Sequence, residues 1–135
     1  MVKELKDWHA KNGTEMTKGW IFGMGYDDAV LKEGRHPTKE DLDKVSTDVP
    51  VVVVHISGHF CVMNSKCLAM SKITAVTPNP GGGIIRRMSG SEEPNGVLAS
   101  GAVEIGAALF STTLMRALLY DLLQSHNQPN YISRN

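Results

Sequence analysis

Four polar side chains of this 135-residue chain stand at the ends of apolar runs, where they could do chemistry. His55 and His59 follow four consecutive valines at residues 51–54, and Tyr26 and Asp28 close an earlier glycine-rich apolar run. Imidazole, phenol and carboxylate groups can transfer protons or hold a polar substrate. Loops at the ends of buried strands carry binding groups in α/β proteins, so we expect His59, Tyr26 and Asp28 to bind substrate.

The two histidines are expected to differ in role because they stand differently relative to the valine strand. Their spacing would align them on a helix but not on a strand, which argues against a two-histidine zinc site. His55 shares a strand face with Val51 and Val53, which predicts a core histidine hydrogen-bonded to backbone. His59 follows Gly58 beyond the strand end, where it either contacts a ligand or caps the strand. We assign no catalytic residue; His59 is the candidate for such a role.

An arginine pair adds a further substrate-binding candidate. Arg86 and Arg87 fall in an expected strand, where alternation turns one toward solvent and the other toward a partner carboxylate. Arg86 is also a candidate for gripping an acidic group of a substrate. The Pro-Gly-Gly-Gly run at residues 80–83 lacks the Lys-Ser/Thr pair of a phosphate-binding loop, so it predicts a tight turn.

The two cysteines, Cys61 and Cys67, are predicted to be free, buried thiols. Their spacing and the lack of neighbouring ligands argue against a metal pair. An alternative hypothesis is a small standalone enzyme that uses His59 together with either Cys61 or Asp28. In the first case Cys61 would be the nucleophile.

The pattern of apolar residues predicts one α/β domain over residues 1–135, with a mixed sheet, flanking helices and a β-hairpin. Asp27 or Asp28 is expected to cap a brief helix through Leu31. Thr38 and Asn64 are expected to start two further helices. The other expected elements are a helix at residues 2–11, strands at 19–26 and 51–55, a hairpin of 84–87 with 97–98, a helical segment at 102–125 and a tail at 126–135.

Composition excludes several classes of partner. The fourteen basic and fourteen acidic residues cancel, which gives no electrostatic case for nucleic acid or an anionic membrane. No apolar run approaches the roughly 20 residues of a membrane helix. The charged N-terminus lacks the apolar segment of a signal peptide, so we expect a cytoplasmic protein.

Five segments, taken in order, resemble the amidohydrolase family 3, the YtcJ-like metal-dependent hydrolases. The resemblance covers about residues 2–98. The segments are residues 19–28, 34–43, 50–59 with 64–65, 77–86 and 93–98. It implies a TIM-barrel hydrolase that cleaves carbon–nitrogen bonds of amides with a divalent metal such as zinc, and hence a small amide-like ligand.

The same resemblance implies that this chain is an incomplete part of such a barrel. A closed barrel needs about 250 residues. The family's early His-x-His motif would precede Met1, its later ligands would follow Asn135, and Ser100 stands where relatives tend to have an acid. We therefore assign no metal site and no metal cofactor to this chain and expect it to be catalytically incomplete. Surface left open by missing strands would favour a homo-oligomer, most simply a dimer, and an alternative role as a binding or oligomerisation module.

Overall fold

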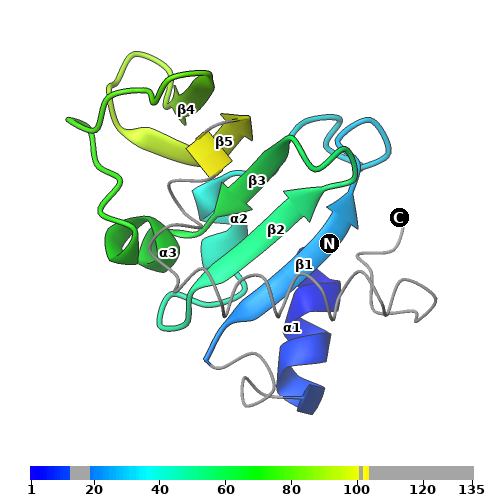
Figure 1. The fold of residues 1–135 in the computed structure, drawn as a ribbon. Helices are drawn as coiled ribbons and strands as arrows, with labels where there is room; N and C mark the ends of the chain where they lie inside the picture. Colours follow the sequence, from blue (N-terminus) through cyan, green and yellow to red (C-terminus); the bar gives the residue numbers. More distant parts are fainter. Residues whose placement is uncertain (13–18, 101, 104–135) are drawn as a thin grey trace.

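The computed structural model describes residues 1–12, 19–100 and 102–103 of the chain (Figure 1). They form three helices and five strands. The helices are α1 (Val2–Asn12), α2 (Lys39–Asp43) and α3 (Ser65–Met70). The strands are β1 (Ile21–Tyr26), β2 (Val51–His55), β3 (Phe60–Met63), β4 (Gly83–Arg87) and β5 (Pro94–Ser100).

The strands form one mixed sheet in the order β1-β2-β3-β5-β4. β1 and β2 are parallel, and the other three pairings are antiparallel. The predicted hairpin is the pair β4–β5, which the 80–83 turn precedes as expected. Within the described residues the sheet is open rather than a closed barrel, so the predicted fold class is confirmed.

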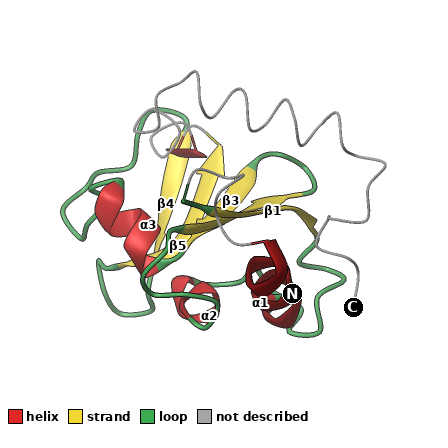
Figure 2. Cartoon of the chain, turned by 90° about the horizontal axis from the view of Figure 1, so that it is seen from below, coloured by secondary structure: helices red, strands yellow, loops and turns green. Residues whose placement is uncertain are grey.

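Side chains from the two faces of the sheet form two apolar clusters. Leu5 of α1 and Leu42 of α2 pack with Val51 and Val53 on one face. Cys67 of α3 packs on the opposite face with the alternate residues of the strands. Figure 2 accordingly shows α1 and α2 on the same side of the sheet. No helix in the described part of the chain is long and apolar enough to span a bilayer.

A single buried side chain, Asn64, fixes the start of β2 and of α3. Its Oδ1 accepts hydrogen bonds from the backbone N–H groups of Val51 (3.0 Å) and Cys67 (2.9 Å). Its Nδ2 donates to the carbonyl oxygens of Ser46 (2.8 Å) and Val49 (2.9 Å). The predicted helix start at Asn64 is therefore confirmed, and the same residue holds the loop before the valine strand.

Two expectations differ from the structure. β3 was not predicted, because its four residues are too few to show an alternating pattern of apolar and polar residues. They also follow directly on the polar turn residues around Gly58. The brief helix through Leu31 is wrong: Asp27 accepts from the N–H groups of Val30 and Leu31, and the chain continues as turns. A single helical turn closes few hydrogen bonds for the backbone it fixes.

The expected helical segment 102–125 lies outside the described residues except for 102–103, which are helical, and the tail 126–135 lies outside entirely.

Candidate functional site

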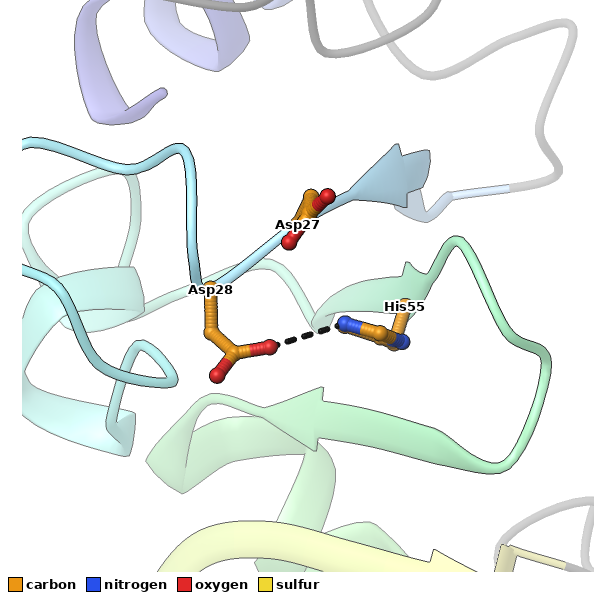
Figure 3. A group of neighbouring side chains, drawn as sticks. All are labelled: Asp27, Asp28 and His55. Atoms are coloured by element: carbon orange, nitrogen blue, oxygen red, sulfur yellow. Dashed lines mark hydrogen bonds and ion pairs between the residues drawn. The ribbon is translucent and has the colours of Figure 1, made fainter.

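The carboxyl ends of β1 and β2 form the candidate site, because these parallel strands end at the same edge of the sheet. Tyr26, the last residue of β1, pairs with His55, the last residue of β2. The register shifts between Met24 and Tyr26, just before the turn that carries Asp28. The carboxylate of Asp28 faces His55 across the two strand ends (Figure 3).

The Asp28 carboxylate lies between two histidines. Its Oδ1 is 2.9 Å from Nε2 of His55, and its Oδ2 is 4.0 Å from Nε2 of His36. His36 precedes α2, and its Nδ1 is 2.8 Å from the hydroxyl of the buried Tyr26. The side chains of His36 and His55 are only 14% and 12% exposed. We call Tyr26, Asp28, His36 and His55 the polar cluster.

Neighbouring donors assign the proton positions on both imidazole rings. The backbone N–H of Ser57 donates to Nδ1 of His55 at 3.0 Å, so the neutral ring carries its proton on Nε2 and donates it to Asp28. On the other ring, the Asp28 carboxylate facing Nε2 of His36 favours a proton on Nε2, so Nδ1 of His36 accepts from the buried Tyr26 hydroxyl. Both rings therefore direct an N–H toward the Asp28 carboxylate.

Burial and neighbouring charge set the protonation states of the polar cluster. Burial raises the pKa of Tyr26 above its usual range, which keeps the phenol a donor. Burial lowers the pKa of His36, and the positive charge of Arg86 adds to this effect, while Asp28 opposes it. Burial acts to raise the pKa of Asp28, but the charge of His36 and the hydrogen bond from His55 outweigh it and lower that pKa. At neutral pH the cluster therefore holds one carboxylate beside a neutral His36.

Phe60 and Arg86 lie beside the polar cluster. The ring centroid of Phe60 is 4.7 Å from that of His36 and 5.8 Å from that of His55. The guanidinium carbon of Arg86 lies over the Phe60 ring, 5.4 Å from its centroid. This cation–π contact orients an exposed positive group next to the histidines.

Asp27, Asp28 and His55 are the potential metal ligands in the described part of the chain, since one donor atom of each lies within 4.8 Å of the others (Figure 3). The hydrogen bonds at these atoms do not fit a bound cation. Nδ1 of His55 accepts from Ser57 and Nε2 donates to Asp28, so the neutral ring keeps no lone pair for a metal. Two carboxylates alone do not reach the three protein ligands of a catalytic zinc site. As folded, His55 and Asp28 form a hydrogen-bonded pair, and Asp27 lies beside them.

The structure brings together two of the four predicted substrate-binding residues. Tyr26 and Asp28 belong to the polar cluster, and Arg86 lies beside it. His59 is exposed in the turn between β2 and β3, outside the polar cluster as defined. Its backbone carbonyl accepts from the N–H of Ser100 at 2.7 Å, which ties this turn to the end of β5.

Two histidines of the cluster were not among the predicted site residues. His55 accepts a backbone N–H, as expected, but it also donates to Asp28 and is only partly buried. His36 was missed altogether. The signal that could have identified it is Pro37, which restricts the backbone of the preceding residue to extended conformations just before the capped helix α2.

Both cysteines are free and buried, as predicted. Burial raises the pKa of the Cys61 thiol to about 12 and that of Cys67 to about 12. Thiols with such pKa values stay protonated at neutral pH, and the thiolate is the form that acts as a nucleophile.

Arg87 does not meet a carboxylate, contrary to the strand-alternation prediction. Its guanidinium donates to the backbone carbonyl oxygens of Thr74 and Glu92, each at 2.9 Å, and to that of Thr77. A guanidinium has five N–H donors, so one arginine can bind three carbonyl oxygens of the loops around β4 and β5 at once. Arg87 is therefore a structural residue that ties these loops together.

Comparison with known proteins identifies relatives of this arrangement. The sequence model of the Amidohydrolase family matches residues 1–128, further than the segments that end at Leu98. LONG AFTER FAR-RED 3 of Arabidopsis thaliana is 33% identical over 78% of this chain, and the N-substituted formamide deformylase of Arthrobacter pascens is 34% identical over 77%. The putative amidohydrolase YtcJ of Bacillus subtilis (strain 168) is 33% identical over 64%.

The aligned residues are a small part of each relative. They make up 17% of the Arabidopsis protein, 19% of the Arthrobacter enzyme and 16% of the Bacillus protein. Among solved structures, an uncharacterized metal-dependent hydrolase from Pyrococcus furiosus superimposes with a TM-score of 0.52 at 24% identity. The match covers 88% of this chain and 24% of that one, and it supports the fold alone.

Proposed function

Because this chain belongs to the Amidohydrolase family, we propose that it carries a substrate-facing part of a metal-dependent hydrolase acting on carbon–nitrogen bonds of small amides. We further propose that the 135-residue chain alone is catalytically incomplete, as part of a TIM barrel would be. In this account the polar cluster binds the amide, and it does not hold the hydrolytic metal.

One observation supports this proposal above the others: two parallel strands end together, and each delivers a polar residue to the same point. Ligands of α/β proteins bind at the carboxyl ends of parallel strands. Tyr26 and His55 occupy the last positions of β1 and β2, and Asp28 joins them from the turn that follows. The Asp28 carboxylate accepts a hydrogen bond from His55 and has its second oxygen 4.0 Å from Nε2 of His36, so this oxygen can accept the N–H of an amide.

The hydrogen bonds of His55 support the second part of the proposal. Hydrolysis of an amide by a metal-dependent enzyme needs several protein ligands that leave a position open on the cation. The ring of His55 is occupied on both nitrogens, by Ser57 and by Asp28. We propose that a divalent metal such as zinc, in a protein that contains this segment, is held by residues outside the polar cluster.

The test is ligand binding and turnover with the purified 135-residue chain. N-Butylformamide is a suitable probe, since one relative is named as an N-substituted formamide deformylase. We expect weak binding, seen by nuclear magnetic resonance as shifts of the backbone signals of Asp28, His36 and His55. We expect no deformylation when zinc or manganese is added.

Variants separate binding at the cluster from nonspecific effects. Asp28→Asn removes the carboxylate and should weaken binding about tenfold, because hydrogen bonds to charged groups are stronger than neutral ones. Asp48→Asn, at an exposed site outside the cluster, is the matched control and should bind like the original chain. Metal-dependent turnover, or shifts confined to residues outside the cluster, would contradict the proposal.

Two properties of the whole protein also remain proposals. We propose that it is cytoplasmic, in line with its two free, buried thiols. We also propose a homo-oligomer, supported by exposed apolar side chains such as Ile84 and Val76, which are 54% and 90% exposed. Light scattering on the purified chain measures the latter, and a monomer at all concentrations would rule it out.

A further inference from the structure

The arginine pair of β4 differs in what its members contact. Arg87 uses its guanidinium for backbone carbonyl oxygens of Thr74, Thr77 and Glu92. Arg86 points away from these groups to the ring of Phe60 and is exposed. The register of β4 with β5 shifts between Ile85 and Arg87, so the two arginines stand at an irregularity of the strand. Of the two arginines, Arg86 is the one whose guanidinium N–H groups can bind a ligand.

Arg86 is close to the polar cluster yet has no acidic partner in the described part of the chain. The salt bridges of the described residues leave it out, whereas Arg35 and Lys39 are paired with Asp41 and Glu93. Burial lowers the pKa of His36 and the charge of Arg86 adds to this effect, whereas at Tyr26 the charge of Arg86 only opposes the rise in pKa that burial causes. An oriented guanidinium without a carboxylate, at the edge of a binding site, matches a carboxylate on the ligand.

The surface next to Arg86 is apolar. Ile84 and Arg86 are both exposed on β4, on either side of the buried Ile85. Ile84 is 54% exposed. A ligand that reaches from the polar cluster to Arg86 would therefore run past Phe60 with Ile84 nearby, which favours an aliphatic segment between its polar ends.

We propose that Arg86 is a specificity-determining residue that binds a carboxylate of the ligand, so that the preferred ligands are amides that also carry a carboxylate. The inference rests on the proposed function, because it assumes that the amide group binds at the polar cluster. It adds the chemical class of the substrate: an amide at one end, a short aliphatic chain, and a carboxylate at the other end. Neutral amides of the same length would bind less well.

A matched pair of probes tests this inference. Succinamate carries an amide and a carboxylate, and succinamide replaces the carboxylate by a second amide. We expect the purified chain to bind succinamate about tenfold more tightly than succinamide, as for a paired charge at a partly exposed site. Arg86→Ala should abolish this preference, and Arg86→Lys should keep part of it, because lysine retains the charge but not the two-pronged geometry.

Lys66→Ala is the control, since Lys66 is an exposed cation on α3 and its loss lowers the net charge equally. It should keep the preference for succinamate. Equal binding of both probes to the original chain, or a preference that survives Arg86→Ala, would overturn the inference while leaving amide binding at the polar cluster intact. Binding of neither probe would overturn the inference together with the proposed function.

Discussion

At the scale of single residues, the charge of Asp28 organises the polar cluster. His36 and His55 each direct an N–H toward one oxygen of Asp28, and the Tyr26 hydroxyl lies against the other nitrogen of the His36 ring. The sequence allowed Tyr26 and Asp28 to be placed at a strand end. The sequence did not reveal His36, because its hydrogen-bond partner Tyr26 is ten residues away along the chain. The two side chains meet only when the loop before α2 has folded back.

Removing the charge of Asp28 should change the titration of His36. Asp28 is the group that raises the pKa of His36 against burial and the charge of Arg86. In Asp28→Asn the pKa of His36 should therefore fall further, as measured by nuclear magnetic resonance of the imidazole signals. Asp48→Asn should leave it unchanged. A pKa of His36 that stays the same or rises in Asp28→Asn would show that the two groups do not interact.

The stability of the fold should depend on pH through His36. Its pKa lies below the 6.5 of an unperturbed histidine, so the unfolded chain binds this proton more readily than the folded chain does. The free energy of unfolding should fall as pH decreases through 6.5 and stop falling, for this residue, below its folded-state pKa. One proton contributes at most about 1.4 kcal/mol per pH unit.

His36→Gln removes this contribution. Urea unfolding between about pH 7.5 and pH 5 should show a shallower decline of stability for the variant than for the original chain. His9→Gln, which changes a histidine of α1, serves as the comparison. Identical pH profiles for His36→Gln and the original chain would contradict the assignment of His36 as a buried neutral imidazole.

At the scale of elements, close approach of backbones holds α2 against the sheet. Gly96 of β5 has a φ of +104°, and a Cβ there would lie 2.7 Å from the backbone N of Lys39 and 2.7 Å from the carbonyl O of Met63. The start of α2 therefore rests directly on β5 and β3. The salt bridge of 2.6 Å between Lys39 and Glu93 lies at the same contact.

Gly96→Ala should destabilise the fold by at least about 2 kcal/mol, since it adds both a strained φ and an overlap with backbone atoms that cannot move aside. Gly90→Ala isolates the first effect. Gly90 has a φ of +70° and nothing within 4 Å of its would-be Cβ. It should cost about 1 kcal/mol. Urea unfolding of both variants makes the comparison, and equal losses would mean that the contact with α2 is not tight.

Asn64→Ala should be among the most damaging single changes in the described residues. It would leave two backbone N–H groups and two carbonyl oxygens without their partner in the interior, at a cost of about 3 kcal/mol or more. Asn64→Asp keeps the acceptor and loses the two donors, so it should lie between. Unfolding by urea ranks the three proteins, and an alanine variant as stable as the original would refute this role.

Most of the helices and strands could be predicted from local patterns in the sequence. The valine strand, the capped helices at Thr38 and Asn64 and the β4–β5 hairpin were predicted, because period, caps and turns are local signals. β3 was not predicted, because its place in the sheet depends on pairing with both β2 and β5 rather than on its own residues. A capped helix was predicted after Asp27; the Asp27 side chain does accept the N–H of Ala29, but the chain continues as turns through Leu31.

At the scale of the whole molecule, the described part of the chain is an open mixed sheet with the polar cluster at the carboxyl ends of β1 and β2. It belongs to the Amidohydrolase family but spans less than a fifth of the curated relatives that it matches, at 16% to 19% of their lengths. Our account assigns ligand binding to this part of such a protein and hydrolysis to a metal held elsewhere.

The most direct test of this account is the metal content of the purified 135-residue chain after incubation with zinc and removal of free metal by gel filtration. We predict far less than one zinc per chain, with no difference between the original protein and Asp28→Asn. The account would be contradicted by one zinc per chain that is lost in Asp28→Asn or His55→Ala, because the polar cluster would then be a metal centre.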